Sequence, residues 1–599
     1  MRASTNAIIP GPENIEFSYN DHQFFGTQGD TIASALINVG QYSCRVTAEG
    51  EPRGVFCGMG VCQECAVCVN GIEGELACMT YLKPGMNIRS QPQYREIPHQ
   101  EGTDLPEVSL DVDVLVIGSG PAGMSAAVVA SESGLRVALV DERGALGGQY
   151  FKQPASDFEL IEDKLDHQYV KGRELIDRLR ESCVSILSGY LVWGAFSQQD
   201  VLLAGKHDRM RISTKHIVLA TGAFEIGMPV NGWTTPGVMT TGAAQTLLRS
   251  YRVALGTEVM ISGNGPLNVQ MAAELIKSGV KVRALAETSK PLGPRNILRS
   301  VKLAWYSPSL FFDGLGYLFL LAKKRVIFRQ GSAVVAISGD SQVTGATVAR
   351  VDSEGYAIPG TEELFSVNAV AMGFGFVPSN EIARSLGCEH EVDPGTGLLR
   401  ATKDDRGLSS VNGVWIAGDS AGVGGAQVAV AQGIIVGSSI AQDFGVALSR
   451  QLQRDLQHAS SKKKRAEKFQ AVLWKIFAGP HIGTKLAEEH TTICRCLSLS
   501  RADIENTLEP DIRSAGALKR INRAGMGKCQ GRYCSSFSIE LATKNSGEQH
   551  DAHSGYAPAV PYKPVTIGQI AYPDIPIPDA PTPDTPTPDT PTLKHSAQS

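Results

Sequence analysis

Hydrophobic and polar residues follow two different periods along the chain. Near the N-terminus, the stretches "IEFSYNDHQFFG" and "CAVCVNG" alternate as strands do, whereas "TIASALINVG" has the spacing of a helix. From residue 111, an apolar strand runs into a glycine-rich turn, an Ala-rich helix and a second strand, and the same order recurs from residue 259. This order predicts a multidomain α/β protein with a small N-terminal domain over residues 12–98 and a core over residues 110–450. The second glycine-rich unit predicts an inserted nucleotide-binding fold at about residues 255–375.

The C-terminal part of the chain contains three further segments. "SSKKKRAEKFQAVLWKIF" places apolar residues at helical spacing, which predicts a surface helix that packs its apolar stripe inward. Residues 485–545 read as a small helical domain. Residues 573–599 begin with the repeat "PDIPIPDAPTPDTPTPDTPT", and proline at this density predicts an extended, disordered tail.

Length and charge restrict the class of protein. At 599 residues the chain is long enough for three or more domains. A formal net charge of −5 gives no broad attraction to nucleic acid, so we expect no nucleic-acid partner. No run of about 18 uncharged apolar residues is present and no secretory leader is recognised, so we expect no transmembrane segment and a cytoplasmic location. Thiols stay reduced in the cytoplasm, where clustered cysteines indicate metal or redox chemistry.

Ten of the twelve cysteines lie in two regions of the chain, and the isolated Cys183 and Cys388 are predicted to be buried core residues. The first region has the spacing CxxxxCxxC followed by one more cysteine, which is the plant-type [2Fe–2S] ligand pattern. Its predicted ligands are Cys57, Cys62, Cys65 and Cys78. A structural zinc ion is the alternative, but zinc sites usually pair two CxxC-like hooks. The pattern therefore predicts a ferredoxin-like β-grasp domain over residues 12–98.

The second region has a CxC pair followed by CxxxxC. Its predicted ligands are Cys494, Cys496, Cys529 and Cys534. This pattern resembles the small helical [2Fe–2S] domain of bacterioferritin-associated ferredoxin, although zinc is a stronger alternative here because CxC is compatible with it. Basic residues such as Arg495 and Arg532 surround the thiols. They would either offset the negative charge of a cluster or form a solvated basic face.

The first glycine-rich turn has all parts of a dinucleotide-binding unit. Its glycines allow a tight turn and close approach of the backbone to a pyrophosphate, and an acid at the end of the second strand suits a ribose. Two later motifs, "HIVLATGAFE" and "NGVWIAGDSAG", resemble those of flavoproteins with two dinucleotide folds, so FAD is favoured over NAD at this site. The predicted FAD residues are Gly118, Gly120, Pro121, Ala122, Gly123, Asp141, Glu142, Gly148, Gln149, Ala220, Thr221, Gly222, Gly418 and Asp419.

The second glycine-rich turn departs from the pattern. Gly263, Gly265 and Glu287 would hold NAD, but Asn268 replaces the third glycine. The sequence leaves open whether NAD binds there or whether only the scaffold is retained. No CxxC pair occurs within residues 110–450, which argues against the flavin-to-dithiol mechanism of thioredoxin reductases.

Three longer stretches carry a more specific resemblance. "ATGAFEIGMPVNGWTTPGVMTTGAAQ", "GFGFVPSNEIARSLGC" and "RAGMGKCQGRYC" resemble the FAD-bearing α (A) subunit of opine oxidases, of D-hydroxyproline and related proline dehydrogenases, of hydrogen cyanide synthase, and the amino-terminal part of heterotetrameric sarcosine oxidase α. This resemblance spans roughly residues 110–570. The first 100 residues resemble the small [2Fe–2S] subunit of the same complexes, fused in front.

The resemblance implies a division of labour within an amine or amino-acid dehydrogenase complex. In that family a D-amino-acid-oxidase-like flavoprotein β subunit oxidises the substrate, and the present subunit collects the electrons and passes them to an acceptor such as a quinone or cytochrome. No residue of this chain is therefore predicted to act as a catalytic base or nucleophile. FMN at a subunit interface and peripheral attachment to a membrane through the complex stay open. The alternatives are a self-contained NAD(P)H-dependent reductase and a scaffold without cofactors.

Overall fold

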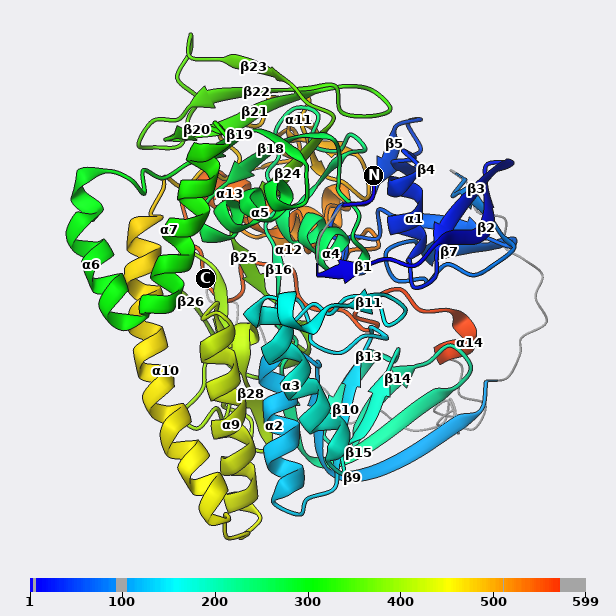
Figure 1. Cartoon of the computed structure of the whole chain (residues 1–599), viewed down its shortest axis with the longest axis vertical. Helices are drawn as coiled ribbons and strands as arrows, with labels where there is room; N and C mark the ends of the chain where they lie inside the picture. Colours follow the sequence, from blue (N-terminus) through cyan, green and yellow to red (C-terminus); the bar gives the residue numbers. More distant parts are fainter. Residues whose placement is uncertain (4–6, 93–104, 510, 571–599) are drawn as a thin grey trace, which may run out of the picture.

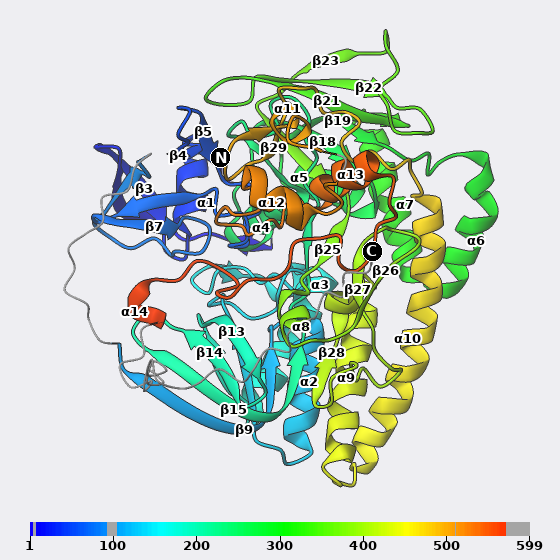
Figure 2. The ribbon, with the colours of Figure 1, turned by 180° about the vertical axis from the view of Figure 1, so that it is seen from behind.

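The computed structural model describes residues 1–3, 7–92, 105–509 and 511–570 (Figures 1 and 2). The predicted C-terminal tail lies outside these residues, as does most of the linker between the N-terminal domain and the core. No helix in the described part of the chain is long and apolar enough to span a membrane.

The N-terminal domain is a five-stranded β-grasp sheet in the order β3-β2-β8-β6-β7. Its strands are β2 (Glu13–Tyr19), β3 (His22–Thr27), β6 (Ala66–Val69), β7 (Ile72–Leu76) and β8 (Met86–Ser90). The predicted helix is confirmed as α1 (Ile32–Asn38), which begins at a capping box formed by Thr31 and Ser34. After the short hairpin β4 (Ser43–Val46) and β5 (Pro52–Gly54), a loop that carries three cysteines leads into β6.

The first half of the core is a seven-stranded sheet in the order β12-β10-β9-β15-β14-β13, with β28 also paired to β15. Its strands are β9 (Glu107–Ile117), β10 (Val137–Asp141), β12 (Ser185–Ser188), β13 (Leu191–Ser197), β14 (Asp200–Ala204), β15 (Arg209–Leu219) and β28 (Val414–Ile416). Helices α2 (Pro121–Glu132), α3 (His167–Glu181) and α9 (Ala426–Asp443) pack together beside it. Strands β9, β10, β12, β15 and β28 are parallel, as a dinucleotide fold requires.

The second half of the core is a parallel sheet in the order β17-β24-β18-β19-β20. Its strands are β17 (Val238–Thr240), β18 (Glu258–Gly263), β19 (Lys281–Glu287), β20 (Ile327–Gln330) and β24 (Ala369–Gly373). Its helices are α4 (Thr241–Tyr251), α5 (Pro266–Lys277), α6 (Ile297–Tyr306) and α7 (Pro308–Lys323). The fold thus starts earlier than the predicted residue 255, because β17 pairs with β24. A three-stranded sheet follows β20 and consists of β21 (Ser332–Ser338), β22 (Gly345–Arg350) and β23 (Glu363–Ser366).

The predicted lysine-rich surface helix is confirmed as part of α10 (Arg450–Ile476), which runs along α9 and reaches α6 (Figure 1). The C-terminal region is small and largely helical: β29 (Thr492–Cys494), β30 (Leu499–Ser500), α11 (Arg501–Glu505), α12 (Ala515–Asn522) and α13 (Ser535–Ser546). The remaining strands and α-helices of the described residues are β1 (Ile8–Ile9), β11 (Glu159–Leu160), β16 (Ala223–Glu225), β25 (Phe376–Pro378), α8 (Glu381–Ser385), β26 (His390–Val392), β27 (Leu399–Ala401) and α14 (Ile567–Ile570).

Candidate cofactor sites

Three parallel strands of the first sheet end at the same edge. Ile117 of β9 pairs with Leu219 of β15, and Leu219 pairs with Ile416 of β28. The residues that follow these strands begin the three motifs predicted to hold FAD, which therefore meet although they lie far apart in the sequence. Ligands of open α/β sheets bind at such a carboxyl edge.

The glycines of the first loop are required by their surroundings. Gly118 has φ 108°, and a Cβ there would overlap the carbonyl oxygen of Ala220. A Cβ on Gly123 would overlap the carbonyl oxygen of Gly118. Gly120 differs, because no atom lies within 4 Å of its missing Cβ and it caps the N-terminus of α2. Open space in front of a helix N-terminus suits a pyrophosphate.

The other predicted FAD residues surround this loop. Gly148, with φ 62°, lies so close that a Cβ would be 2.7 Å from the Cα of Gly120, and Gln149 follows it half-buried. A Cβ on Gly418 would lie 2.9 Å from the Cβ of Ala122, which packs the late motif against α2. Asp419 Oδ1 accepts from the amides of Gly424 and Gly425 at 2.9 and 3.1 Å, at the start of α9. Burial raises the pKa of Asp419.

The two acids at the end of β10 have different partners. Asp141 Oδ2 accepts from the amide and hydroxyl of Ser119, each at 2.7 Å, so the carboxylate supports the glycine loop. Burial raises the pKa of Asp141. Glu142 instead accepts from Lys563 Nζ at 2.6 Å, which ties the C-terminal segment to the site.

One cavity joins three distant parts of the chain. It is lined by Met59 and Val61 of the first cysteine loop, by Gly118, Asp141, Glu142 and Thr221 of the first core fold, and by Arg532, Tyr562 and Lys563 of the C-terminal region. The glycine cradle, the helix N-terminus and the acids fit the diphosphate and ribose of FAD.

A buried Lys–Glu pair near this site was not predicted from the sequence. Lys152 Nζ donates to Gln245 Oε1 at 3.0 Å and to the carbonyl of Gly242 at 3.2 Å, while Glu225 Oε2 accepts from the Gly242 amide at 2.6 Å. Burial lowers the pKa of Lys152 to about 7 and raises that of Glu225 to about 7. The only sequence signal was position: Glu225 follows "ATGAF" and Lys152 follows "GGQYF".

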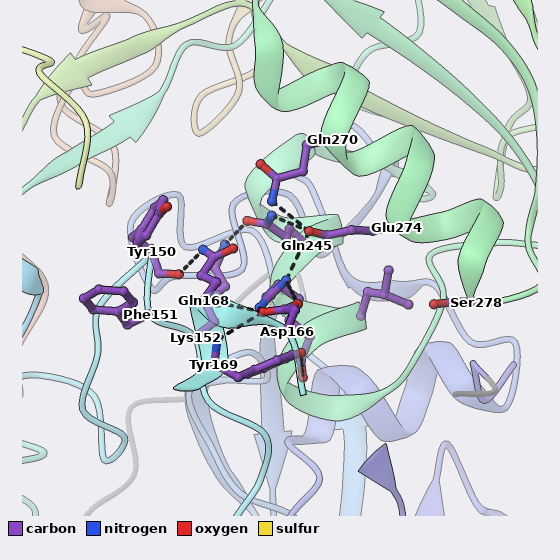
Figure 3. Close-up of polar contacts among 12 residues, drawn as sticks. Tyr150, Phe151, Lys152, Asp166, Gln168, Tyr169, Gln245, Gln270, Glu274 and Ser278 are labelled. Atoms are coloured by element: carbon purple, nitrogen blue, oxygen red, sulfur yellow. Dashed lines mark hydrogen bonds and ion pairs between the residues drawn. The ribbon is translucent and has the colours of Figure 1, made fainter. Parts of the chain in front are cut away.

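Beyond Lys152, a polar network joins the two core folds (Figure 3). Gln245 Nε2 and Gln270 Nε2 donate to Glu274 at 3.4 and 2.8 Å. The buried Arg249 guanidinium forms ion pairs with Glu274 at 3.1 Å and with Asp166 at 3.0 Å. Because Asp166 belongs to the first fold and Arg249 and Glu274 to the second, these contacts fix the orientation of one fold to the other.

The four predicted ligand thiols of the first cysteine region lie in two pairs, Cys57 with Cys62 and Cys65 with Cys78, whereas Cys44 and Cys68 are not among the predicted ligands. Burial opposes ionisation of Cys57, but hydrogen bonds from the Cys62 side chain and from backbone amides outweigh it and lower its pKa to about 6. Two of these amides, of Met59 and Cys62, lie 3.5 and 3.3 Å from Cys57 Sγ. The thiolate is the form that binds metal.

The thiols of the second region also lie in pairs, Cys494 with Cys534 and Cys496 with Cys529. The Cys534 side chain lowers the pKa of Cys494 to about 7. Among the described residues, no group of three or more His, Cys, Asp or Glu side chains could hold one metal ion. Paired thiols fit a [2Fe–2S] cluster, in which each iron takes two thiolates, better than a single zinc ion, which needs four ligands around one point.

The two cysteine regions pack directly against each other. The ring of Phe56, beside Cys57, lies 5.3 Å from the ring of Tyr533, beside Cys534, in an edge-to-face arrangement. The Phe56 ring also contacts that of Trp233, with a centroid distance of 5.6 Å. Arg495, between Cys494 and Cys496, is buried over the Phe56 ring and donates to the Trp233 carbonyl at 2.8 Å. Arg495 therefore does not belong to a solvated basic face.

A buried carboxylate completes this contact. Glu64, between Cys62 and Cys65, is 1% exposed and lies 3.0 Å from Arg45, 3.7 Å from Arg53 and 3.6 Å from Arg495. Arg53 also donates to Glu51 at 2.6 Å, so two acids face three arginines and one positive charge is left beside both sets of thiols. Arg532, near the second set, forms an ion pair with Glu381 at 2.7 Å.

The second glycine loop is covered by the end of α10 and the residues after it. Asn264 Nδ2 donates to the Phe477 carbonyl at 2.9 Å, and Trp474 lies 3.8 Å from the missing Cβ of Gly265. Glu287 is fully buried and accepts from the amides of Gly265 and Ser289, each at 3.0 Å, and from the Ser289 hydroxyl at 2.8 Å.

Asn268 occupies the place of the missing third glycine. Its Nδ2 donates to the Gly373 carbonyl at 2.8 Å and its Oδ1 accepts from the Thr241 hydroxyl at 2.8 Å. The side chain therefore ties α5 to the ends of β24 and β17. Elsewhere, Cys388 is buried as predicted, but the prediction for Cys183 was wrong, because its thiol is exposed just after α3.

Comparison with known proteins agrees with these sites. Residues 12–93 match the model of a 2Fe-2S iron-sulfur cluster binding domain, and residues 112–302 match that of a pyridine nucleotide-disulphide oxidoreductase. These matches support the prediction of an iron–sulfur cluster and FAD. The fold and the sites define a flavoprotein oxidoreductase with an N-terminal iron–sulfur domain, which confirms the predicted fold class and enzyme class.

Relatives with similarity over most of the chain show the family. Hydrogen cyanide synthase subunit HcnB of Pseudomonas aeruginosa is 31% identical over 463 residues, which cover 75% of this chain and 96% of that protein. HcnB of Pseudomonas protegens is 30% identical (74% and 94% covered), and an opine oxidase subunit of Agrobacterium tumefaciens is 29% identical (77% and 91% covered). The chain belongs to the family of these subunits, as its resemblance predicted.

A solved structure shows the same fold. The L-proline dehydrogenase from P. horikoshii superimposes with a TM-score of 0.68 at 20% sequence identity, and the match covers 93% of this chain and 97% of that one. At this identity the match shows the fold alone.

Proposed function

We propose that this chain is the electron-transferring FAD and iron–sulfur subunit of an amine or amino-acid dehydrogenase complex. A D-amino-acid-oxidase-like β subunit oxidises the substrate, and this chain passes the electrons to an acceptor. Its relatives support this role, since they are subunits of hydrogen cyanide synthase, of opine oxidase and of sarcosine oxidase. Opines, proline derivatives and glycine are the substrate classes to test.

The observation that carries the proposal is the shared cavity. Met59 and Val61 precede Cys62, Arg532 precedes Cys534, and both loops line the cavity of the FAD glycine loop. FAD accepts electrons in pairs and releases them singly, whereas a [2Fe–2S] cluster carries one electron at a time. The shared lining of this cavity therefore supports a proposal in which a two-electron site lies close to two one-electron sites.

The residues between the sites are suited to this role. Phe56, Trp233 and Tyr533 are buried and in ring contact, so they exclude water from the space between the two thiol sets. The three arginines around Glu64 hold positive charge there, which offsets the negative charge of thiolate-bound clusters. Lys152 and Glu225, which contact the carbonyl and the amide of Gly242 beside the same junction, would be the side chains able to hold or release a proton there.

The alternative of a self-contained NAD(P)H-dependent reductase has less support. The predicted NAD residues Gly265 and Glu287 are engaged by the chain itself, through Trp474 and internal hydrogen bonds. We therefore propose that the second fold is a retained scaffold. Mixing the purified chain with stoichiometric NADH tests this point directly, because rapid bleaching of the flavin would favour the reductase.

Cofactor content and a partner requirement test the main proposal. The purified chain should contain FAD and four iron atoms per chain, and its dithionite-reduced form should show two [2Fe–2S] EPR signals. Cys62→Ser should remove one signal and Cys496→Ser the other, with Cys68→Ser as a matched control that removes neither. The chain should oxidise an opine, proline derivative or glycine only after its β subunit is added. Turnover by the chain alone would contradict the division of labour.

A further inference from the structure

Two neighbouring helices expose an unusual number of large apolar side chains. On α6 they include Leu298, Val301 and Trp305, and on α7 they are Phe312, Leu315 and Phe319. The exposed fractions reach 78% for Leu298, 79% for Trp305 and 70% for Phe319. On each helix the three residues are spaced by three and four positions, so they form one stripe per helix. We call these six residues the α6–α7 face.

The opposite sides of both helices pack against other helices of the molecule. Helix α6 packs on α10, and α7 packs on α5. Arg465 of α10 donates to the carbonyls of Trp305 and Tyr306 at 3.0 and 2.6 Å, which fixes the end of α6. The hairpin is thus held against the core, and its outer stripes have no partner among the described residues. Exposed apolar patches of this kind mark interaction sites.

The surroundings of the α6–α7 face are strongly basic. Residues 290–325 contain seven basic residues and one acid: Lys290, Arg295, Arg299, Lys302, Lys323, Lys324, Arg325 and Asp313. Helix α10 adds a second basic group beside α6, and Lys464, Arg465 and Lys468 line a hollow together with Trp305. The whole chain carries a net charge of −5, so this local excess is a specific feature of the face.

The composition favours one kind of partner. Protein–protein interfaces are depleted in lysine, whereas helices that lie on membranes combine Trp, Phe and Leu with flanking Lys and Arg. We infer that the α6–α7 face docks on an anionic lipid bilayer, with Trp305 and Phe319 inserted at the headgroup level. No described helix can span a membrane, so this attachment is peripheral. Helices α6 and α7 lie on the opposite side of the molecule from the β-grasp domain (Figures 1 and 2).

Vesicle binding by the full purified chain tests the inference. The chain should co-sediment with phosphatidylcholine vesicles that contain phosphatidylglycerol, and weakly or not at all with pure phosphatidylcholine. Trp305→Ala combined with Phe319→Ala should weaken binding by about tenfold or more, because the two aromatic rings that insert into the bilayer are lost. Lys302→Gln or Lys464→Gln should each weaken it about fivefold, and added salt should weaken the wild type.

Matched controls separate this face from the rest of the surface. Leu364→Ala removes a side chain that is 70% exposed on β23, and Lys206→Gln removes a surface cation; neither should change vesicle binding. Absence of binding to anionic vesicles, or binding that the α6–α7 variants do not alter, would overturn the inference. So would a dimer in sedimentation velocity, or a complex with the β subunit, that these variants abolish while vesicle binding persists. FAD and iron content should stay unchanged in every variant, so a negative result here leaves the proposed electron transfer untouched.

Discussion

The two glycine-rich loops of the core begin with the same motif and have opposite surroundings. In the first, the space in front of Gly120 is open and the two cysteine loops line the adjoining cavity. In the second, Trp474 and the Phe477 carbonyl cover the loop, and the Glu287 carboxylate accepts hydrogen bonds from within the chain. Both loops keep the strand, turn and helix that the motif encodes. The difference lies in what distant parts of the chain place in front of them.

This contrast supports the proposal that the second dinucleotide fold is retained as a scaffold. The second fold still packs against the first cysteine loop, since a Cβ on Gly58 would lie 3.0 Å from the Cβ of Ala243 on α4. The Thr240 amide also donates to the Phe56 carbonyl at 2.9 Å. The second fold thus positions a predicted cluster beside the first fold, and this role needs no bound nicotinamide.

The largest change in stability is expected at the charge cluster that joins the two cysteine loops. Glu64→Gln leaves the buried Arg495 and the half-buried Arg45 without their carboxylate, while Arg53 keeps Glu51, and it should lower the free energy of unfolding by about 3–5 kcal/mol. Arg495→Gln should lower it less, because Arg45 and Arg53 still neutralise Glu64. Denaturant unfolding followed by tryptophan fluorescence measures both changes.

Glu363→Gln is a matched control for that experiment, because its ion pair with Arg329 is of similar length, 2.8 Å, but exposed. Exposed pairs contribute about 0–1 kcal/mol. If Glu64→Gln were no more destabilising than this control, the charge cluster would not hold the two cysteine loops together.

A smaller, pH-dependent effect is expected at the second site. Burial raises the pKa of Glu287 from 4.5 to about 7, so the folded state binds this proton more tightly than the unfolded state does. The contribution is fully present below pH 4.5 and is lost as the pH rises through 7, by up to about 3 kcal/mol. Glu287→Gln should remove this slope between pH 5 and pH 8.

Unfolding curves of the wild type and of Glu287→Gln at several pH values check this prediction. Glu389→Gln, an exposed carboxylate, controls for the change in net charge. Parallel pH profiles of the wild type and Glu287→Gln would contradict the prediction, because they would show that the Glu287 carboxyl group does not titrate in this range. The carboxylate would then be available to a ligand.

Local features of these sites followed from the sequence. The glycines, the eight thiols and the acids after the strands are each required by the conformation of the nearby backbone. Such local requirements appear in the sequence as fixed spacings between residues. The contact of Glu64 with Arg495 could not be predicted, because it joins two loops at opposite ends of the chain. The covering of Gly265 by Trp474 depends in the same way on where a long helix ends.

Two single residues show the same limit. Asn268 was recognised as a departure from the motif, but its hydrogen bonds to Gly373 and Thr241 became visible only in the structure. Cys183 was expected in the core because an isolated cysteine is usually buried, yet it lies on the surface. Composition gives the usual environment of a residue type, whereas the environment of one residue depends on the packing around it.

A methyl group at the first loop should separate cofactor binding from folding. Gly120 has φ −74°, which alanine adopts easily, and its missing Cβ has no neighbour within 4 Å. Gly120→Ala should therefore leave the unfolding of the FAD-free chain unchanged but weaken FAD binding by about tenfold or more, because the backbone approaches the pyrophosphate closely there. Fluorescence titration with FAD measures the affinity, and Gly314→Ala, also with open space around it, is the control. Unchanged FAD affinity would place the cofactor elsewhere.

The smallest effect is expected from restoring the motif in the second loop. Asn268→Gly recreates the third glycine but removes the hydrogen bonds to Gly373 and Thr241, so stability should fall by about 1–2 kcal/mol. NADH should still fail to bleach the flavin, because Trp474 and Phe477 continue to cover Gly265 and Asn264. Asn268→Ala removes the same hydrogen bonds without recreating the motif and controls for their loss. If Asn268→Gly alone gained NADH oxidation, the missing glycine rather than the covering segment would be what distinguishes the two loops.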